Sequence, residues 1–556
     1  MPFEKISLLC CSCLLVLSAI AQREVVPGWH LLDKQTDGYN GISLQKAYQH
    51  LAGKKAEKVI VAVLDGGTDT LHEDLRPVLW RNPKEIAGNK LDDDHNGYVD
   101  DVFGWNFLGN ETGENVEEEI SEAARIYNEL KPFFESVPAC DTSKFCDSTY
   151  QVYKLWKEAG KMLEVSPEDL MTLRLVQATS KVAHRYDSIL CGEWQRKEFT
   201  MQDLEAFKPE GNDARKAKMG FLKFMNLLQF DSDITNTEMF DQIGEFISRQ
   251  EQLISAKQTP TASFRYRIVN DDPNKMDTRP YGNADVMAGN PLHGTHVAGI
   301  IAAERNNRVG IEGVANNVCI MTVRVVPKGD EHDKDVAMGI RYAVNNGAKV
   351  INMSFGKEIS PRKGWVDDAI RYAASKDVLI VHAAGNDGLN IDEKRSYPSP
   401  LLNDQTLATN MITVGASGDS SLKTGIVADF TNFGEQFVDL LAPGVKIYSS
   451  VPNNKYAYEK GTSMAAPIVS GVAALIRGYY PTLTATEVKQ VIEESVDVSY
   501  QQSLLPRPGG EKSGKLPLAK LCRTGGIVNA YNAVLLAEKI EQSKKHPKLG
   551  TGKTPN

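Results

Sequence analysis

Short runs of uninterrupted apolar residues recur along the chain, and each ends at polar or turn-forming residues. The runs cover residues 58–65, 319–326, 349–355, 378–384 and 411–414. Runs of this length without alternation are typical of strands buried on both faces, as in a parallel sheet. Elsewhere apolar residues return every three or four positions, which predicts amphipathic helices. These helices cover residues 296–304, 335–345, 366–376, 463–478 and 484–494.

The alternation of strands and helices predicts an α/β fold, a doubly wound and mostly parallel sheet flanked by helices. Residues 114–262 break this pattern, because they are rich in Glu, Lys, Leu and Met and have helical periodicity at 115–130, 150–163, 167–186 and 238–253. A block of about 150 residues is longer than any ordinary loop. We therefore predict a large helical insertion at 114–262 between two parts of the α/β domain, 22–113 and 263–540, and a disordered tail at 541–556.

The first residues have the pattern of a secretory signal. An apolar run from Ile6 to Ile20 follows Lys5, and the small-residue sequence Ala19-Ile-Ala21 ends it. This predicts a signal peptide at 1–21, with lipidation of Cys10, Cys11 or Cys13 as the weaker alternative. We expect an exported protein, in the periplasm, at the cell surface or outside the cell. No later run reaches the roughly 18 apolar residues of a membrane span, so we expect no transmembrane segment.

Composition narrows the range of partners. The chain is 42% hydrophobic and 24% charged, with a formal net charge of -9 and no basic stripe. We therefore expect no nucleic-acid partner. Export permits disulfides, and Cys140 with Cys146 is the one closely spaced pair after residue 21.

Two histidines, His293 and His296, stand three residues apart at the start of a predicted helix. Residues at this spacing share a helix face, so both imidazoles could bind one metal ion. Alternatively, one is a general base and the other is packed. The usual zinc-binding helix has histidines four apart with a glutamate between them, and no third ligand is evident nearby.

Ser463 follows Gly461 where another helix is predicted to begin. This position exposes the hydroxyl and directs a backbone N–H outward from the helix N-terminus, which suits an anion. Taken alone, a serine that caps a small-residue packing helix is the commoner explanation.

Four blocks together resemble the signature motifs of the subtilisin-like (subtilase) serine peptidases. They are Val61-Ala-Val-Leu-Asp65, His293-Gly-Thr-His-Val-Ala-Gly299, His382-Ala-Ala-Gly-Asn386 and Gly461-Thr-Ser463-Met-Ala-Ala-Pro467. The chain order Asp, His, Ser is the order of this family. The resemblance covers residues 40–108 and 264–540 and leaves the insertion unmatched. It implies a secreted serine endopeptidase, a hydrolase that acts on protein or peptide substrates and needs no cofactor for its chemistry.

The resemblance implies a role for each matched residue. Ser463 is expected to be the nucleophile, His293 the general base and then acid, and Asp65 the residue that orients the imidazole. The side-chain amide of Asn386 and the backbone N–H of Ser463 are expected to form the oxyanion hole. His296 is then expected to pack against the core.

The substrate-binding walls also follow from the resemblance. They are Ser354, Phe355 and Gly356 on one side, which pair with the peptide backbone, and Ala383, Ala384 and Gly385 on the other. Phe355 and the alanines make the pocket apolar, which favours cleavage after large hydrophobic residues.

A second candidate site lies in residues 91–101. The candidate ligands are Asp92, Asp94, Asn96, Tyr98 and Asp100. Their spacing matches the first part of an EF-hand calcium loop, but Phe103 replaces the bidentate glutamate and no flanking helix is evident. The loop is either a structural calcium site, which would relieve repulsion among the carboxylates, or an acidic solvated turn.

The insertion separates Asp65 from His293, so it is expected to project near the catalytic face. There it would restrict substrate access, add a binding site, inhibit the enzyme or remain inert. The alternative function is a catalytically silent or self-inhibited subtilase scaffold that binds a partner through the insertion.

Overall fold

A seven-stranded parallel sheet forms the centre of the protein. The computed structural model describes residues 25–545 except 139–144, 229, 231–233, 258–263, 278, 423 and 511–513. The sheet has the order β2-β3-β1-β4-β5-β6-β7, and its strands pair in parallel throughout. The strands are β1 (Val59–Asp65), β2 (Gly104–Asn106), β3 (Val318–Arg324), β4 (Val350–Met353), β5 (Leu379–Ala383), β6 (Met411–Ser417) and β7 (Leu440–Pro443).

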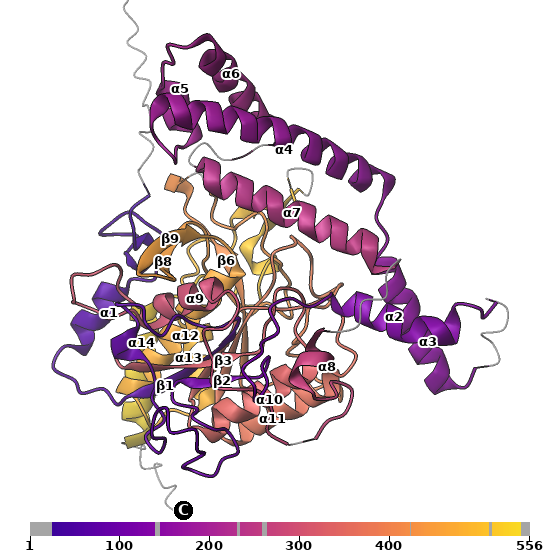
Figure 1. The fold of residues 1–556 in the computed structure, drawn as a ribbon. Helices are drawn as coiled ribbons and strands as arrows, with labels where there is room; N and C mark the ends of the chain where they lie inside the picture. Colours follow the sequence, from indigo (N-terminus) through magenta and orange to yellow (C-terminus); the bar gives the residue numbers. More distant parts are fainter. Residues whose placement is uncertain are drawn as a thin grey trace, which may run out of the picture.

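Helices cover both faces of the sheet (Figure 1). One face carries α9 (Leu292–Ala302) and α12 (Thr462–Tyr479), behind which lie α1 (Leu44–Leu51), α13 (Ala485–Glu494) and α14 (Ala530–Lys545). The other face carries α10 (Asp333–Asn345) and α11 (Lys363–Ser375). In β1, the side chains of Val61 and Val63 belong to the apolar core on the α9 and α12 face. Those of Ala62 and Leu64 belong to the core on the α10 and α11 face. Burial on both faces explains why these strands are uninterrupted apolar runs, and the predicted α/β fold is confirmed.

The order of the strands reverses at the carboxyl ends of β1 and β4. From β1 the sheet grows one way through β3 to β2 and the other way through β4 to β7. Ligands of open α/β sheets bind where the order reverses in this manner. Asp65 ends β1, and Ser354 directly follows β4, so the two polar groups meet at one edge.

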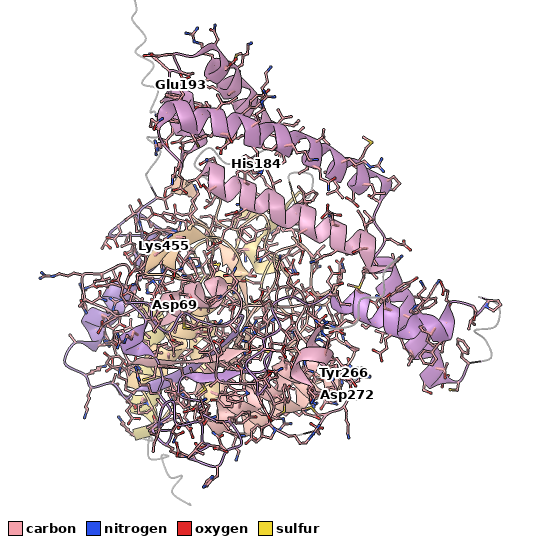
Figure 2. The ribbon with its side chains drawn as sticks, in the orientation of Figure 1. Asp69, His184, Glu193, Tyr266, Asp272 and Lys455 are labelled. Atoms are coloured by element: carbon pink, nitrogen blue, oxygen red, sulfur yellow. The ribbon has the colours of Figure 1, made fainter. Side chains whose placement is uncertain are left out.

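Seven helices lie between β2 and α9 in the described part of the chain. They are α2 (Glu122–Phe134), α3 (Asp147–Met162), α4 (Pro167–Trp194), α5 (Met201–Ala206), α6 (Asn212–Leu227), α7 (Asn236–Ala256) and α8 (Phe264–Val269). Helices α4 to α7 enclose a core of their own that includes Phe199 and Phe221. They form an arm above the body, on which Figure 2 shows His184 and Glu193 far from Tyr266 and Asp272.

Several boundaries differ from the sequence-based expectation. Helix α2 begins at Glu122 rather than at 115, because the Ser121 side chain caps it and Asn115 and Glu118 form β-bridges with Gly109 and Lys328 instead. Helices α5, α6 and α8 were not predicted from the sequence. A short hairpin of β8 (Ile447–Val451) and β9 (Lys455–Glu459), and a second one of β10 (Leu504–Pro506) and β11 (Lys515–Pro517), were also missed.

The disordered tail was predicted to start too early. Helix α14 continues to Lys545, and Lys544 and Lys545 pair with Glu487 (2.6 Å) and Glu541 (2.9 Å). Lysines in the last turn also interact favourably with the helix dipole. The predicted signal peptide, residues 546–556 and Cys140 lie outside the described residues. Among the helices that are described, none combines the length and hydropathy required to cross a bilayer.

Candidate active site

The carboxylate of Asp65 and the imidazole of His293 form a close pair. His293 is the second residue of α9, and its Nδ1 lies 2.8 and 2.9 Å from the two Asp65 oxygens. Burial alone would lower the pKa of His293, but the charge and hydrogen bonding of Asp65, with a further contribution from Glu459, raise it overall. Because the imidazole side chain is 41% exposed and Asp65 only 4%, water moderates the desolvation and the carboxylate dominates.

Ser463 is presented at the start of the buried helix α12. Among residues 461–478 it is the one that is partly exposed. Gly461 precedes the helix with φ +151°, a conformation that disfavours side chains and turns the chain sharply into α12. The Ser463 hydroxyl donates to the Ser354 carbonyl oxygen (3.1 Å). Within the described residues no hydrogen bond joins it to His293; such contacts often form only in the substrate complex.

Thr462 orients the amide of Asn386. The backbone N–H and the hydroxyl of Thr462 both donate to the Asn386 side-chain oxygen, at 2.8 and 3.0 Å. An ideal Cβ at Gly461 would lie 3.4 Å from the Asn386 amide nitrogen and 3.5 Å from the Ser463 backbone nitrogen, so both nitrogens lie beside the same point. The Thr462 hydroxyl in turn accepts from the Gly385 N–H (3.1 Å). Two outward donors, the Asn386 NH₂ and the N-terminal N–H groups of α12, can therefore face one anionic atom.

The segment Ser354–Gly356 continues from β4 beside Ser463. The Ser354 hydroxyl donates to the Ser463 carbonyl oxygen (2.9 Å) and accepts from the Asn352 amide (2.9 Å). Asn352 also accepts from Ser470 of α12 (2.8 Å), so a polar chain ties the strand end to the helix. Gly356 is exposed, which leaves backbone available to a bound peptide.

The expected opposite wall leaves the end of β5. Gly385 has φ +106°, and a Cβ there would lie 2.3 Å from the Asn432 amide. Asn432 holds this loop, since its amide donates to the Ala384 carbonyl (3.0 Å) and its backbone N–H donates to that of Gly385 (2.8 Å). Ala383 and Ala384 are buried. A small pocket beside Ala384 is lined by Arg395 and Ser396, among others.

His296 has surroundings unlike those of His293. It is fully buried, and its Nε2 lies 3.2 Å from the Ala457 carbonyl oxygen. Burial lowers its pKa to about 3, so it remains neutral in the fold. The two histidines therefore contact different partners, Asp65 and the Ala457 carbonyl oxygen.

The acidic loop brings some of its predicted ligands together. Carboxylate oxygens of Asp92, Asp94 and Glu85 all lie within 4.8 Å of one another. Glu85 was not expected, because it precedes the loop. The Asp100 carboxylate lies outside this group and accepts from the backbone N–H groups of Gly88 and Lys90. The Asn96 oxygen accepts from the Tyr98 N–H (2.7 Å).

Other positioning residues were also missed by the sequence analysis. They are Thr462, Asn432, Asn352 and Ser470. Thr462 stands next to Ser463 in Gly-Thr-Ser and could have been inferred from that adjacency. The other three act through contacts distant in sequence, and nothing in their local pattern distinguishes them.

A model of the Subtilase family (Peptidase_S8) matches residues 56–513. The chain belongs to the subtilase family. It is 41% identical over 276 residues to the "Thermophilic serine proteinase" of Bacillus sp. (strain AK1), covering 48% of this chain and 55% of that protein. It is 35% identical over 230 residues to "Alkaline elastase YaB" of Bacillus sp. (strain YaB), covering 40% and 56%. "Subtilisin DY" of Bacillus licheniformis is 35% identical over 221 residues, which are 38% of this chain and 75% of that protein.

This subtilase thus spans little more than half the length of the first two relatives, 55% and 56%. The family match confirms the resemblance found in the sequence motifs.

Proposed function

We propose that this subtilase is a secreted serine endopeptidase in which Asp65, His293 and Ser463 form the catalytic triad. The observation that carries the proposal is the Asp65–His293 pair, with Nδ1 held 2.8 Å from the carboxylate, at the same sheet edge as Ser463. This contact fixes the imidazole with Nε2 outward. Nε2 then takes the proton of the Ser463 hydroxyl as Oγ attacks the scissile carbonyl carbon, and later donates it to the leaving amine.

The oxyanion of the tetrahedral intermediate would be stabilised by Asn386 and the backbone N–H of Ser463. Support comes from the two hydrogen bonds of Thr462 to the Asn386 oxygen, because they preorganise the amide before charge develops. Preorganised donors avoid the reorganisation that water would require. No cofactor takes part in these steps.

Peptide substrates would lie between Ser354, Phe355 and Gly356 on one side and Ala383, Ala384 and Gly385 on the other. The buried alanines favour a large hydrophobic residue before the scissile bond. The helical insertion at 114–262 would modulate access to this groove. The alternative is a silent or self-inhibited scaffold, and the intact Asp65–His293 pair favours an enzyme.

The loop at 92–100 would hold a structural calcium ion. Calcium prefers oxygen ligands, and Glu85, Asp92 and Asp94 supply them within 4.8 Å of one another. The Glu85 Oε2 atom is buried without a hydrogen-bond partner, and its pKa is raised mainly by burial. A cation would satisfy this oxygen and offset the repulsion between the carboxylates.

Active-site labelling tests the proposed triad. A fluorophosphonate should label the intact protein at Ser463, and Ser463→Ala should abolish labelling. His293→Ala should lower peptide hydrolysis by about 10⁶-fold, because no base remains to take the serine proton. The matched control is His296→Gln on the same helix, which should cost stability but leave the folded fraction labelled. An intact protein that is not labelled would instead support the silent or self-inhibited scaffold.

A peptide library tests the specificity. The residue before the scissile bond should be large and apolar, because burial of its side chain against alanines supplies about 1.5–3 kcal/mol. A cleavage profile dominated by Asp or Glu would contradict this expectation and would indicate that Arg395 determines the preference of the pocket. A profile dominated by Arg or Lys would contradict it as well.

Calcium titration tests the acidic loop. Calcium at a hundredfold excess over its Kd should stabilise the protein by about 2.7 kcal/mol, measured as a higher Tm that EDTA reverses. Glu85→Gln should abolish the shift, whereas Glu111→Gln, which changes an exposed carboxylate outside the loop, should retain it. A Tm that neither calcium nor EDTA changes would leave the loop an acidic turn.

A further inference from the structure

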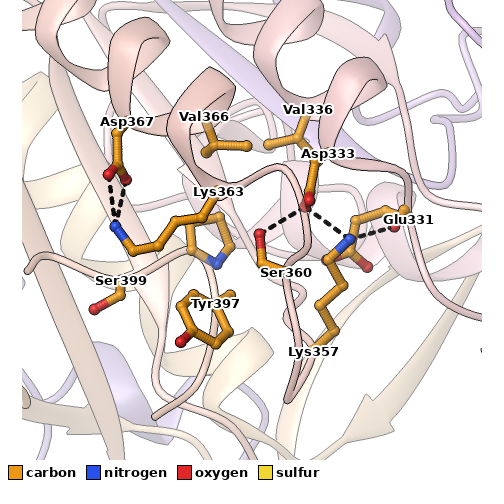
Figure 3. Close-up of a pocket in the computed structure, with 11 residues that line it drawn as sticks. Glu331, Asp333, Val336, Lys357, Ser360, Lys363, Val366, Asp367, Tyr397 and Ser399 are labelled. Atoms are coloured by element: carbon orange, nitrogen blue, oxygen red, sulfur yellow. Dashed lines mark hydrogen bonds and ion pairs between the residues drawn. The ribbon is translucent and has the colours of Figure 1, made fainter. Parts of the chain in front are cut away.

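The side chain of Lys357 is buried immediately beyond the Ser354–Gly356 segment. It is 2% exposed, and its Nζ lies 2.6 Å from a Glu122 oxygen and 2.8 Å from an Asp333 oxygen. It also donates to the Glu331 carbonyl oxygen (2.8 Å). Figure 3 shows the ammonium between Glu331 and Asp333. A buried ammonium without such partners would be strongly unfavourable, so the position of the segment depends on them.

Glu122 connects this lysine to the insertion. It is the first residue of α2 and makes two further contacts. Its carboxylate pairs with Arg125 (2.7 Å) and its backbone N–H donates to Asp330 (2.8 Å), while Arg125 also donates to the Glu331 carbonyl (3.0 Å). The start of α2 is therefore fixed relative to the residues that precede α10.

Apolar contacts also connect the chain after Lys357 to the insertion. Ile359, two residues after Lys357, is 5% exposed and belongs to a cluster with Ala124 of α2, Ala159 of α3 and Ala256 of α7. On the other side, Lys357 exchanges two backbone hydrogen bonds with Tyr397, at 3.0 and 2.8 Å. The chain at 357–359 is thus enclosed between the α/β domain and the insertion.

A peptide bound along residues 354–356 would run toward residues 357–359. Ser354 is the end of the segment nearest the nucleophile, because its carbonyl oxygen accepts from the Ser463 hydroxyl. A peptide whose scissile carbonyl lies at Ser463, and whose backbone pairs along residues 354–356, continues past Gly356 toward 357–359. Main-chain pairing of this kind requires the receiving strand to be held straight and in place.

We propose that Lys357 is a positioning residue through which the insertion, by way of Glu122, sets the strand that binds the extended peptide substrate. This inference rests on the proposed peptidase function. Residues several places before the scissile bond need the strand in register, whereas the chemistry at Ser463 does not. Loss of the link should therefore raise the KM of long peptides and leave small substrates unaffected.

Two substrates of different length separate these effects. The first is a peptide with about five residues before the scissile bond, and the second is a single-residue ester that reaches only Ser463 and its pocket. Glu122→Gln keeps the shape of the side chain and removes its charge, while Lys357 retains Asp333. This variant of the full chain should raise the peptide KM about tenfold, keep its kcat, and leave ester hydrolysis within about twofold. Glu122→Asp, which keeps the charge, should recover part of the peptide KM.

Asp271→Asn is the matched control. Asp271 is a buried carboxylate that also pairs with one lysine and one arginine, Lys334 (2.6 Å) and Arg265 (2.9 Å). It fastens α8, which follows the insertion, to α10, and its hydrogen bonds in the described part of the chain do not reach residues 354–359. This control variant should leave both the peptide KM and the rate of ester hydrolysis unchanged.

Three results would overturn the proposal. They are an unchanged peptide KM in Glu122→Gln, an equal loss with peptide and ester, and the same selective loss in Asp271→Asn. If Glu122→Gln does not fold, Ile359→Val should raise the peptide KM selectively through the apolar contact, and an unchanged peptide-to-ester ratio would contradict the proposal. Absence of fluorophosphonate labelling in the unmodified chain would refute the peptidase function itself, which distinguishes the two failures.

Discussion

The parallel alignment of β1 and β4 is the constraint on which the site depends. Because neighbouring parallel strands end at the same edge, Asp65 and Ser354 lie there together although they are 289 positions apart in the sequence. Helix α9 then brings His293 to Asp65, and α12 brings Ser463 to Ser354. Burial of both sheet faces leaves the carboxyl edge as the place where polar groups can gather.

Buried ion pairs attach the insertion to this framework. Glu122 with Lys357 fastens its first helix, and Arg265 with Asp335 (2.6 Å) fastens α8, which directly follows it. Both pairs lie at the start of α10. Desolvation alone would raise the pKa of Glu122, yet Arg125 and Lys357 lower it to about 2. Because the folded pKa lies below the usual value, this stabilisation is present above pH 4.5 and is lost as the pH falls toward 2. The pairs fix orientation more than they add stability, since desolvation offsets their attraction.

The sequence predicted the long strands better than the tertiary contacts of the candidate site. Continuous apolar runs revealed β1, β3, β4, β5 and β6, whereas β2 has three residues and carries no periodicity. Motifs singled out Asp65, His293 and Ser463 as the candidate triad, because each motif is local in the sequence. Glu85 and the partnership of Glu122 with Lys357, 235 positions apart, depend on tertiary packing. No local pattern encodes them.

The pH dependence of fluorophosphonate labelling tests the central claim, that Asp65 and His293 act on Ser463 as one unit. His293 must be neutral to accept the serine proton, and Asp65 raises its pKa above the ordinary 6.5. The labelling rate should therefore rise with pH to a plateau, with a midpoint above 6.5. In Asp65→Asn that midpoint should move down and the plateau rate should fall about 10⁴-fold. A midpoint that Asp65→Asn does not change would contradict the account.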